Sequence, residues 1–280
     1  MIDAHCHLEQ KEYDLDRDQV IEACKKAGLK AVITSSAHPK DLELTLSLAE
    51  KYKGFVYACF GLHPEFIKDN LFAKKVDQKG LDEYLEKLKE NKKKIVAIGE
   101  IGLDFFWIKE KSWREKQEEQ FVQLINFAKE IKKPLVVHSR DAGEETFKIL
   151  EKEDCKKVLL HFFSYKDLVD RVIENKWSVS VNLLVTRNKG IRKIVQKIPI
   201  EQIMLETDAP WIGPQKPVSE LKPQDKLFFK NEQIATLRND PTTIKQTAEK
   251  ISELKKLDFE TVWKICGKNA ERFFALKPDD

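Results

Sequence analysis

Short apolar runs rich in β-branched residues alternate along the chain with longer stretches in which apolar residues recur every three or four positions. The short runs predict eight strands, at residues 1–5, 31–35, 55–62, 95–101, 135–138, 158–162, 178–182 and 202–206. The longer stretches predict amphipathic helices, among them 15–27, 41–52 and 113–132. Strands that alternate with helices in this way form parallel sheets.

Eight repeats of strand and helix favour a closed (β/α)8 barrel, the TIM barrel of the α/β class, over an open doubly wound sheet. Periodicity alone does not establish closure, so the open sheet stays as an alternative. Residues 209–225 carry four prolines and predict a long ordered loop, and residues 242–254 and 259–274 predict two further helices. We therefore expect one domain spanning residues 1–280, a barrel with additional C-terminal helices.

The amino-acid composition indicates the class of protein but does not identify a binding partner. The 280 residues are 41% apolar and 35% charged, which is typical of a soluble globular protein. Lys and Arg (50) nearly balance Asp and Glu (47), so net charge argues neither for nor against nucleic acid. The five scattered cysteines suit reduced thiols, with Cys6 in the core, and no apolar run reaches membrane length. We expect a cytoplasmic monomer that does not associate with membranes.

Polar side chains of an unusual kind stand at or just past the ends of six predicted strands. They are His5, His7, His63, Glu100, His138, His161 and Asp208. In a barrel the carboxyl ends of the strands converge on one face, where active sites lie. The sixth histidine, His38, precedes a helix-starting proline and is expected to be structural.

Several of these residues are suited to bind metal. His5 and His7 are separated by one strand residue, so both imidazoles face the same side. A carboxylate such as Glu100, after an apolar run, is costly to bury unless a cation or hydrogen bonds compensate. Taken singly, each residue has an ordinary structural interpretation, such as a salt-bridged carboxylate or a core histidine. Four imidazoles and two carboxylates exceed the needs of one tetrahedral ion, whereas two ions that share a carboxylate would use them all.

The residues also lie in segments that resemble the TatD family of metal-dependent deoxyribonucleases. These segments are IDAHCHL (2–8), GLHP (61–64), IGEIGLD (98–104), HSRDA (138–142), LHFFS (160–164), LETDAP (205–210), RNDP (238–241) and NAERF (269–273). Each motif is short, but their number and order span essentially the whole chain. The resemblance implies a TIM barrel of the amidohydrolase-like group and a nuclease that acts on DNA.

Residue by residue, the resemblance implies two metal positions and a phosphate contact. His5, His7 and Asp208 would bind one divalent ion, His138 and His161 the second, and Glu100 would bridge them. The identity of the ions, Mg, Mn or Zn, stays open. His63 and Arg140 would contact the substrate phosphate, and Asp208 would accept a proton from the attacking water.

The sequence departs from the family pattern beside the expected site. Residues 162–165 read Phe-Phe-Ser-Tyr where family members commonly have Cys-Phe-Ser-Gly, and Asn182 stands where a smaller residue is usual. None of these residues is an expected ligand, so the departures bear on the choice of substrate. The aromatic side chains of Phe105, Phe106, Trp107 and Trp211 follow strand ends and either stack on bases or pack within loops.

Three functions are therefore considered. The first is a metal-dependent deoxyribonuclease that shortens DNA from the 3′ end. The second is a hydrolase of an ester or amide, such as an aminoacyl-tRNA linkage, because a fold does not fix the substrate. The third is a nucleic-acid-binding protein without catalysis, against which the complete set of expected ligands weighs.

Overall fold

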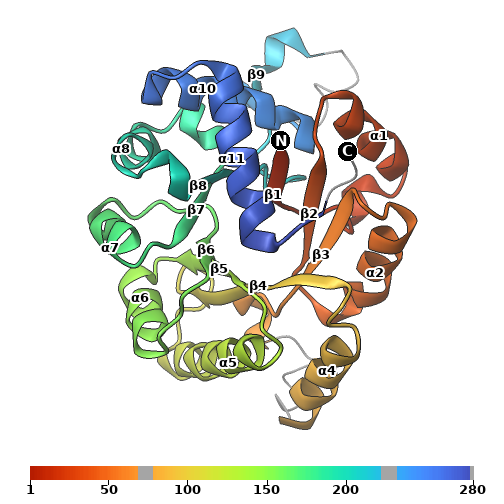
Figure 1. Cartoon of the computed structure of the whole chain (residues 1–280), viewed down its shortest axis with the longest axis vertical. Helices are drawn as coiled ribbons and strands as arrows, with labels where there is room; N and C mark the ends of the chain where they lie inside the picture. Colours follow the sequence, from red (N-terminus) through yellow and green to blue (C-terminus); the bar gives the residue numbers. More distant parts are fainter. Residues whose placement is uncertain (69–77, 222–231, 278–280) are drawn as a thin grey trace.

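The structure, a computed structural model, describes residues 1–68, 78–221 and 232–277. Eight strands form one sheet in which each strand pairs in parallel with the next along the chain. They are β1 Ile2–Cys6, β2 Ala31–Ser36, β3 Val56–Phe60, β4 Ile95–Asp104, β5 Leu135–Arg140, β6 Val158–Leu160, β7 Ser178–Val181 and β8 Ile203–Leu205. The sheet curls into a nearly closed barrel with helices outside it, which confirms the predicted TIM barrel (Figure 1).

The helices that connect the strands cover the outside of the sheet. They are α1 Arg17–Lys26, α2 Leu42–Lys51, α4 Gln78–Glu90, α5 Lys111–Glu130, α6 Gly143–Lys152, α7 Val169–Glu174 and α8 Lys189–Lys197. The helices predicted at residues 15–27, 41–52 and 113–132 occur within two residues of the expected bounds. Within the described ranges, no helix is long and apolar enough to cross a membrane.

Two C-terminal helices, α10 Ile244–Lys255 and α11 Phe259–Phe274, follow the barrel as predicted. A side-chain oxygen of Asp240 accepts a hydrogen bond from the Thr242 amide and begins the turn that leads into α10. Gly267 of α11 lies against the first residues of the chain, where an added Cβ would be 3.3 Å from Met1 Cα. Helix α11 therefore lies across the end of the barrel from which the strands start, as Figure 1 shows, and the opposite end stays open.

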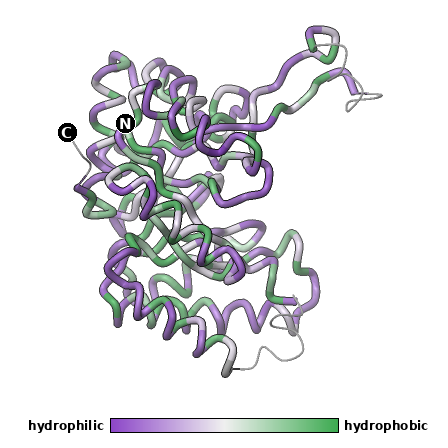
Figure 2. Tube along the Cα trace, turned by 90° about the vertical axis from the view of Figure 1, so that its right-hand side faces the viewer, coloured by the Kyte–Doolittle hydropathy of each residue, from purple (hydrophilic) through white to green (hydrophobic). Residues whose placement is uncertain are grey.

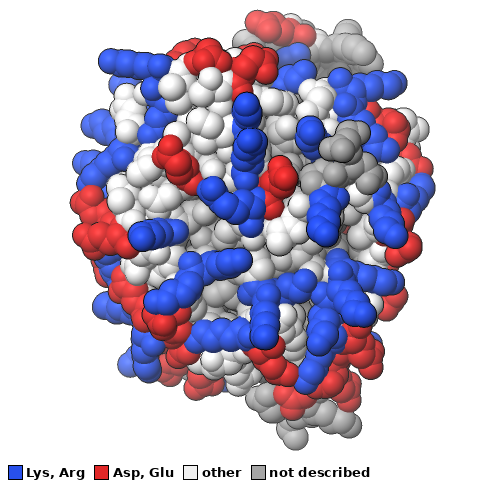
Figure 3. Space-filling view, in the orientation of Figure 1, with Lys and Arg blue, Asp and Glu red and all other residues white. Residues whose placement is uncertain are grey.

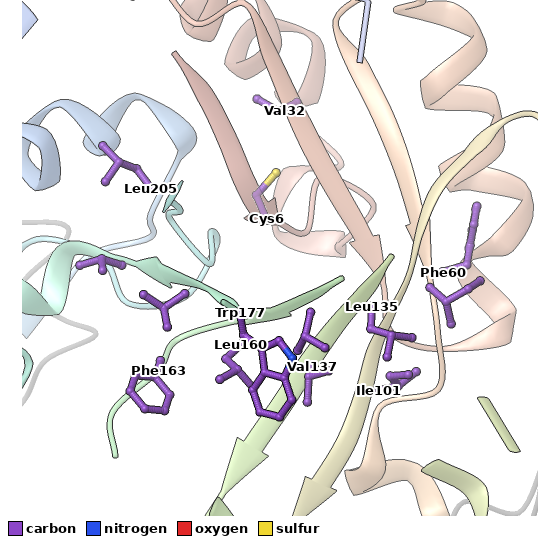
Figure 4. Close-up of a cluster of buried hydrophobic side chains, with 14 of the residues drawn as sticks. Cys6, Val32, Phe60, Ile101, Leu135, Val137, Leu160, Phe163, Trp177 and Leu205 are labelled. Atoms are coloured by element: carbon purple, nitrogen blue, oxygen red, sulfur yellow. The ribbon is translucent and has the colours of Figure 1, made fainter. Parts of the chain in front are cut away.

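The main hydrophobic core lies between the strands and the surrounding helices. Its members include Val32, Leu135 and Val137 on strands, and the fully buried Trp177 donates a hydrogen bond from Nε1 to Cys155 O (2.8 Å) (Figure 4). Cys6 is buried in the same cluster, as expected, and all five cysteines are free and buried.

Strands β4 and β5 run further than predicted, to Asp104 and Arg140. Beyond the predicted ends, Leu103 pairs with the polar Ser139 and Asp104 pairs with Arg140, so hydrogen bonding continues past the residues from which the prediction was made. The extension carries these polar residues to the open end of the barrel.

The region after β8 contains a hairpin that the proline-rich sequence did not predict. Strand β9, Gln215–Pro217, pairs in antiparallel fashion with β10, Ile234–Thr236. Figure 2 shows this hairpin at the upper right, extending away from the side on which the N-terminus lies. Residues 222–225 of the expected loop lie outside the described residues.

Candidate metal centre

The side chains predicted from strand ends meet at the open end of the barrel. His5 lies in β1, Glu100 in β4 and His138 in β5. His7 and His161 follow β1 and β6 directly, and His63 and Asp208 lie three residues past the ends of β3 and β8. All of them except the fully buried His5 line one cavity of about 730 Å³. Arg140 lines the same cavity.

Glu100 lies at the centre of the cluster, and its two carboxylate oxygens face different histidines. Oε2 lies 3.3 Å from His5 Nε2 and 3.8 Å from His7 Nε2. Oε1 lies 2.8 Å from His138 Nδ1 and 2.7 Å from His161 Nε2. One buried carboxylate therefore joins two sets of imidazoles.

The first set has the spacing of a tetrahedral metal site. His5 Nε2 and His7 Nε2 are 3.1 Å apart and lie 3.6 and 3.4 Å from Asp208 Oδ1. Ligands about 2.1 Å from a tetrahedral ion are about 3.4 Å from one another. Glu100 Oε2 adds a donor 3.3 and 3.8 Å from the nitrogens of His5 and His7.

The second set is smaller and more open. His138 Nδ1 and His161 Nε2 are 3.3 Å apart, and both contact Glu100 Oε1. His63 Nε2 lies 3.4 Å from the same oxygen, while His63 Nδ1 accepts a hydrogen bond from the Glu65 amide (3.2 Å). With only His138, His161 and Glu100 as donors and a cavity beside them, the second set leaves room for water or substrate oxygens. The two sets also adjoin each other, because the His5 and His161 rings stack at 4.1 Å.

The pKa values show how strongly these groups interact. Burial disfavours the charged carboxylate of Glu100, yet the imidazoles of His161 and His63 outweigh it and hold the pKa of Glu100 well below its usual range. Burial lowers the pKa of His7, but hydrogen bonds to Asp208 and Glu9 raise it to about 10. Burial and the neighbouring His161 lower the pKa of His5. Without a cation the cluster retains protons among these groups, and a divalent cation would replace them.

Local backbone geometry fixes the residues at the strand ends. Asp208 and Phe162 adopt left-handed conformations (φ 55° and 48°), which turn the chain sharply after β8 and β6. The Asp208 amide donates to His5 O (2.9 Å), so the loop after β8 is tied to β1. Gly102, with φ 143°, lies where a Cβ would be 2.0 Å from His138 O, so β4 and β5 approach closely only with glycine there.

The residues expected to contact phosphate lie on the wall of the cavity. The Arg140 guanidinium is exposed and stacks over the Phe106 ring at 3.8 Å. His38, which was expected to be structural, accepts a hydrogen bond from the Lys40 amide at Nδ1 and caps the turn Pro39–Asp41. His38 also lines the cavity.

The four aromatic residues considered for base stacking divide into two groups. Phe105 is only 7% exposed and packs in the core. Phe106, Trp107 and Trp211 are 38%, 57% and 45% exposed, and the Trp211 ring lies 4.6 Å from that of His7. The last three therefore stand at the rim of the site.

Two of the departures from the family pattern also lie at the cavity. Phe162 and Tyr165 line it, and the Tyr165 hydroxyl accepts hydrogen bonds from Ser139 Oγ (3.1 Å) and the Ala142 amide (3.3 Å). Tyr165 thus supports the segment that carries Arg140.

The sequence analysis did not predict three buried carboxylates that lie beside the histidines, on the side of each ring that faces away from Glu100 or Asp208. Glu9 lies 3.3 Å from His7 Nδ1, Asp104 lies 3.0 Å from His138 Nε2, and Glu206 lies 3.5 Å from His161 Nδ1. All three lie in or beside the quoted motifs, so their proximity to the expected ligands was the available signal.

Comparisons with known proteins show the family to which this chain belongs. Residues 2–275 match the family model described as TatD related DNase. The human deoxyribonuclease TATDN3 is 32% identical over 277 residues, which cover 98% of this chain and 94% of that protein. The uncharacterized metal-dependent hydrolase YabD of Bacillus subtilis is 31% identical over 283 residues, 99% of each chain.

Solved structures show the same fold. The crystal structure of the TatD homologue YJJV from Escherichia coli superposes with a TM-score of 0.82 at 23% identity, covering 99% of this chain and 98% of that one. A TatD-family hydrolase from Entamoeba histolytica gives a TM-score of 0.83 at 22% identity, with 99% and 98% covered.

Proposed function

This chain belongs to the TatD-related DNase family, a family of hydrolases, and from that premise we propose that it is a divalent-metal-dependent deoxyribonuclease. The observation that carries the proposal is the division of the Glu100 carboxylate, whose Oε2 faces His5 and His7 while Oε1 faces His138 and His161. A bridging carboxylate between two ions requires this arrangement.

We assign the ligands of two divalent ions accordingly. His5, His7 and Asp208 would hold one ion, His138 and His161 the other, with Glu100 shared. Two ions bound there would lower the pKa of a water molecule and stabilise negative charge on the attacking and leaving oxygens of a phosphodiester. Imidazole nitrogens favour Mn or Zn, while carboxylates also accept Mg.

The protein groups bind and orient the substrate and accept the proton. The Asp208 carboxylate is 9% exposed and lines the cavity, so it can take the proton of the attacking water as a general base. Arg140 would hold a phosphate oxygen through its planar fork of N–H donors, and His63, which follows β3, would also contact the phosphate. The exposed rings of Trp107 and Trp211 are placed to stack on bases beside that phosphate.

The family resemblance supports shortening from the 3′ end. We further propose that the protein acts as a monomer, because each of the assigned ligands comes from this one chain. The five free, buried cysteines suit a reducing compartment such as the cytoplasm.

The test is cleavage of end-labelled single-stranded DNA by metal-stripped protein, with Mg, Mn or Zn added back and Glu100→Ala as the control. Metal-dependent shortening that the variant lacks would support the proposal, and a label at each end in turn would give the direction. Retained activity in Glu100→Ala would overturn the site assignment. Intact DNA despite two bound ions would reject the substrate, and a panel of ester and amide substrates, including aminoacyl-tRNA, would follow.

A further inference from the structure

We propose that Glu206 and Glu9 are positioning residues, each of which orients one histidine of a different metal position. The proposal rests on the proposed function, because it assumes the two ions assigned there. Neither carboxylate reaches the centre of the cluster. Each carboxylate lies beside the histidine ring nitrogen that points away from the centre of the cluster.

The first pair is His161 and Glu206. His161 Nε2 faces Glu100 at 2.7 Å, and its other ring nitrogen, Nδ1, lies 3.5 Å from Glu206 Oε2. Glu206 is fully buried, so its orientation is set by protein groups and not by solvent. A histidine that donates a proton from one nitrogen to a carboxylate presents the lone pair of the other nitrogen to a metal.

Three neighbours hold the Glu206 carboxylate in place. Oε2 accepts a hydrogen bond from Ser180 Oγ (2.5 Å), and Oε1 accepts from the Phe162 amide (3.0 Å) and from Asn182 Nδ2 (3.1 Å). Asn182 and Phe162 are two of the positions at which this sequence departs from the family pattern. The Asn182 side chain therefore has a specific task in this chain, which is to fix the carboxylate behind His161.

The second pair, His7 and Glu9, has the same construction on the other side. His7 Nε2 faces Asp208 at 3.4 Å, while His7 Nδ1 lies 3.3 Å from Glu9 Oε1. Glu9 is 3% exposed, and its Oε2 accepts a hydrogen bond from Thr34 Oγ1 (2.6 Å). Arg17 donates to the backbone oxygens of residues 8–10 and steadies the segment that carries Glu9.

A third carboxylate supports the same interpretation. Asp104 Oδ2 lies 3.0 Å from His138 Nε2, while His138 Nδ1 faces Glu100 at 2.8 Å. Asp104 Oδ1 accepts from the Trp107 amide (2.8 Å). Three of the four imidazoles assigned to metal thus have a buried carboxylate on the outward nitrogen. For the fourth, His5, the described residues supply no hydrogen-bond partner at Nδ1, and His161 Nδ1 also has no hydrogen bond although Glu206 Oε2 lies 3.5 Å from it.

The two pairs serve separate positions, so their removal should have separate effects. His7 belongs with His5 and Asp208, whereas His161 belongs with His138. Glu206→Gln should weaken one ion by about 10–100-fold and leave the other unchanged, and Glu9→Gln should do the reverse. Asn182→Ala should weaken the same ion as Glu206→Gln, by a smaller factor.

The experiment is a Co²⁺ titration of the metal-free full-length protein, followed by visible absorption and by competition with a chelator of known affinity. Wild type, Glu206→Gln, Glu9→Gln, the double variant and Asn182→Ala are compared, with the exposed Glu249→Gln of α10 as the charge-matched control. Thermal unfolding of each metal-free protein shows that the fold is retained. The positions are told apart in His138→Ala protein, in which Glu9→Gln should still weaken binding and Glu206→Gln should have no further effect.

We expect two binding steps in wild type, one step weakened in each single variant, and both weakened in the double variant. If wild type binds two ions and the variants match it, the inference is overturned while the proposed function stands. Equal weakening of both steps in each single variant would also overturn it, because that pattern indicates a general structural effect. Fewer than two ions in wild type would overturn the inference together with the two-ion assignment.

Discussion

The guanidinium of Arg140 lies 3.8 Å from the centre of the Phe106 ring, so a charged side chain at the wall of the cavity is held by an aromatic face from the neighbouring strand end. Trp107 extends the same surface, with its ring centre 5.6 Å from the guanidinium carbon. The stack leaves the N–H groups at the edge of the guanidinium plane available for a phosphate oxygen.

Removal of this stack should weaken substrate binding without removing the charge. Phe106→Leu should lower kcat/KM on DNA by about 2–5-fold, since an exposed cation–π contact contributes about 0.5–1 kcal/mol. Arg140→Lys keeps the charge but loses the planar fork and should have a larger effect, about 10–100-fold. Steady-state kinetics on a labelled oligonucleotide measure both. Wild-type kinetics in Arg140→Lys would show that the fork does not contact the phosphate.

Removal of metal should destabilise the protein as well as inactivate it. An ion bound only by the folded state at 100 times its dissociation constant adds about 2.7 kcal/mol to the free energy of unfolding. At about 2–4 °C per kcal/mol, Tm should rise by about 5–10 °C when Mn²⁺ is returned to chelator-treated protein.

Differential scanning calorimetry with and without chelator measures this shift. Glu100→Ala should show a much smaller increase, because both metal positions share that carboxylate. An equal increase in the variant would indicate that the stabilising ion binds elsewhere.

Metal affinity should rise with pH. In the metal-free protein burial lowers the pKa of His7, but hydrogen bonds to Asp208 and Glu9 outweigh it and raise the pKa to about 10. His161 behaves in the same way, with its contact to Glu100 raising its pKa well above the usual value. A group with a raised pKa keeps its proton at pH 7, and the proton must leave before the nitrogen binds metal.

The apparent affinity for Mn²⁺ should therefore increase by about tenfold per pH unit for each proton displaced, between pH 6.5 and 8.5. Electron paramagnetic resonance of free Mn²⁺ measures the affinity, and calorimetry in buffers of different ionisation enthalpy counts the protons released. An affinity that stays constant over this range would contradict the assigned ligands.

The sequence predicted the barrel because its period is simple. Each apolar run is followed by an amphipathic helix, and eight repeats of that pattern have few alternative folds. The hairpin of β9 and β10 escaped prediction because each strand has three residues, and Pro217 weakens the pattern of the first. A strand of three residues is too short to show a detectable periodicity.

The histidine cluster was predictable for a different reason. A ligand such as His138 ends an apolar strand, where the carboxyl face of a barrel requires it to point toward the site. Glu206 precedes Thr207 within the same motif as Asp208, yet nothing in its spacing indicates that its partner would be His161, 45 residues earlier. That contact arises from the packing of β6, β7 and β8 side by side, which only the structure supplies. The assignment of residues 1–280 to one domain stays a prediction.

The close approach of β4 to β5 leads to a final prediction about Gly99, which precedes Glu100 in β4. A Cβ at Gly99 would lie 2.5 Å from Val136 Cβ and 2.6 Å from Val136 O, so the strands must separate to admit it. Gly99→Ala should lower the free energy of unfolding by about 1–3 kcal/mol and should also displace Glu100 from the imidazoles. Urea denaturation and metal titration measure the two effects.

Gly80 of α4 provides the matched control, because an added Cβ there meets nothing within 4 Å. Gly80→Ala should stabilise the protein slightly, by about 0.5–1 kcal/mol, since alanine favours helix more than glycine does. Metal affinity should stay unchanged in Gly80→Ala and fall in Gly99→Ala. If Gly99→Ala loses stability but binds both ions as wild type does, then strand spacing at this glycine does not set the position of Glu100. The bridging geometry would in that case depend on the imidazoles that surround Glu100.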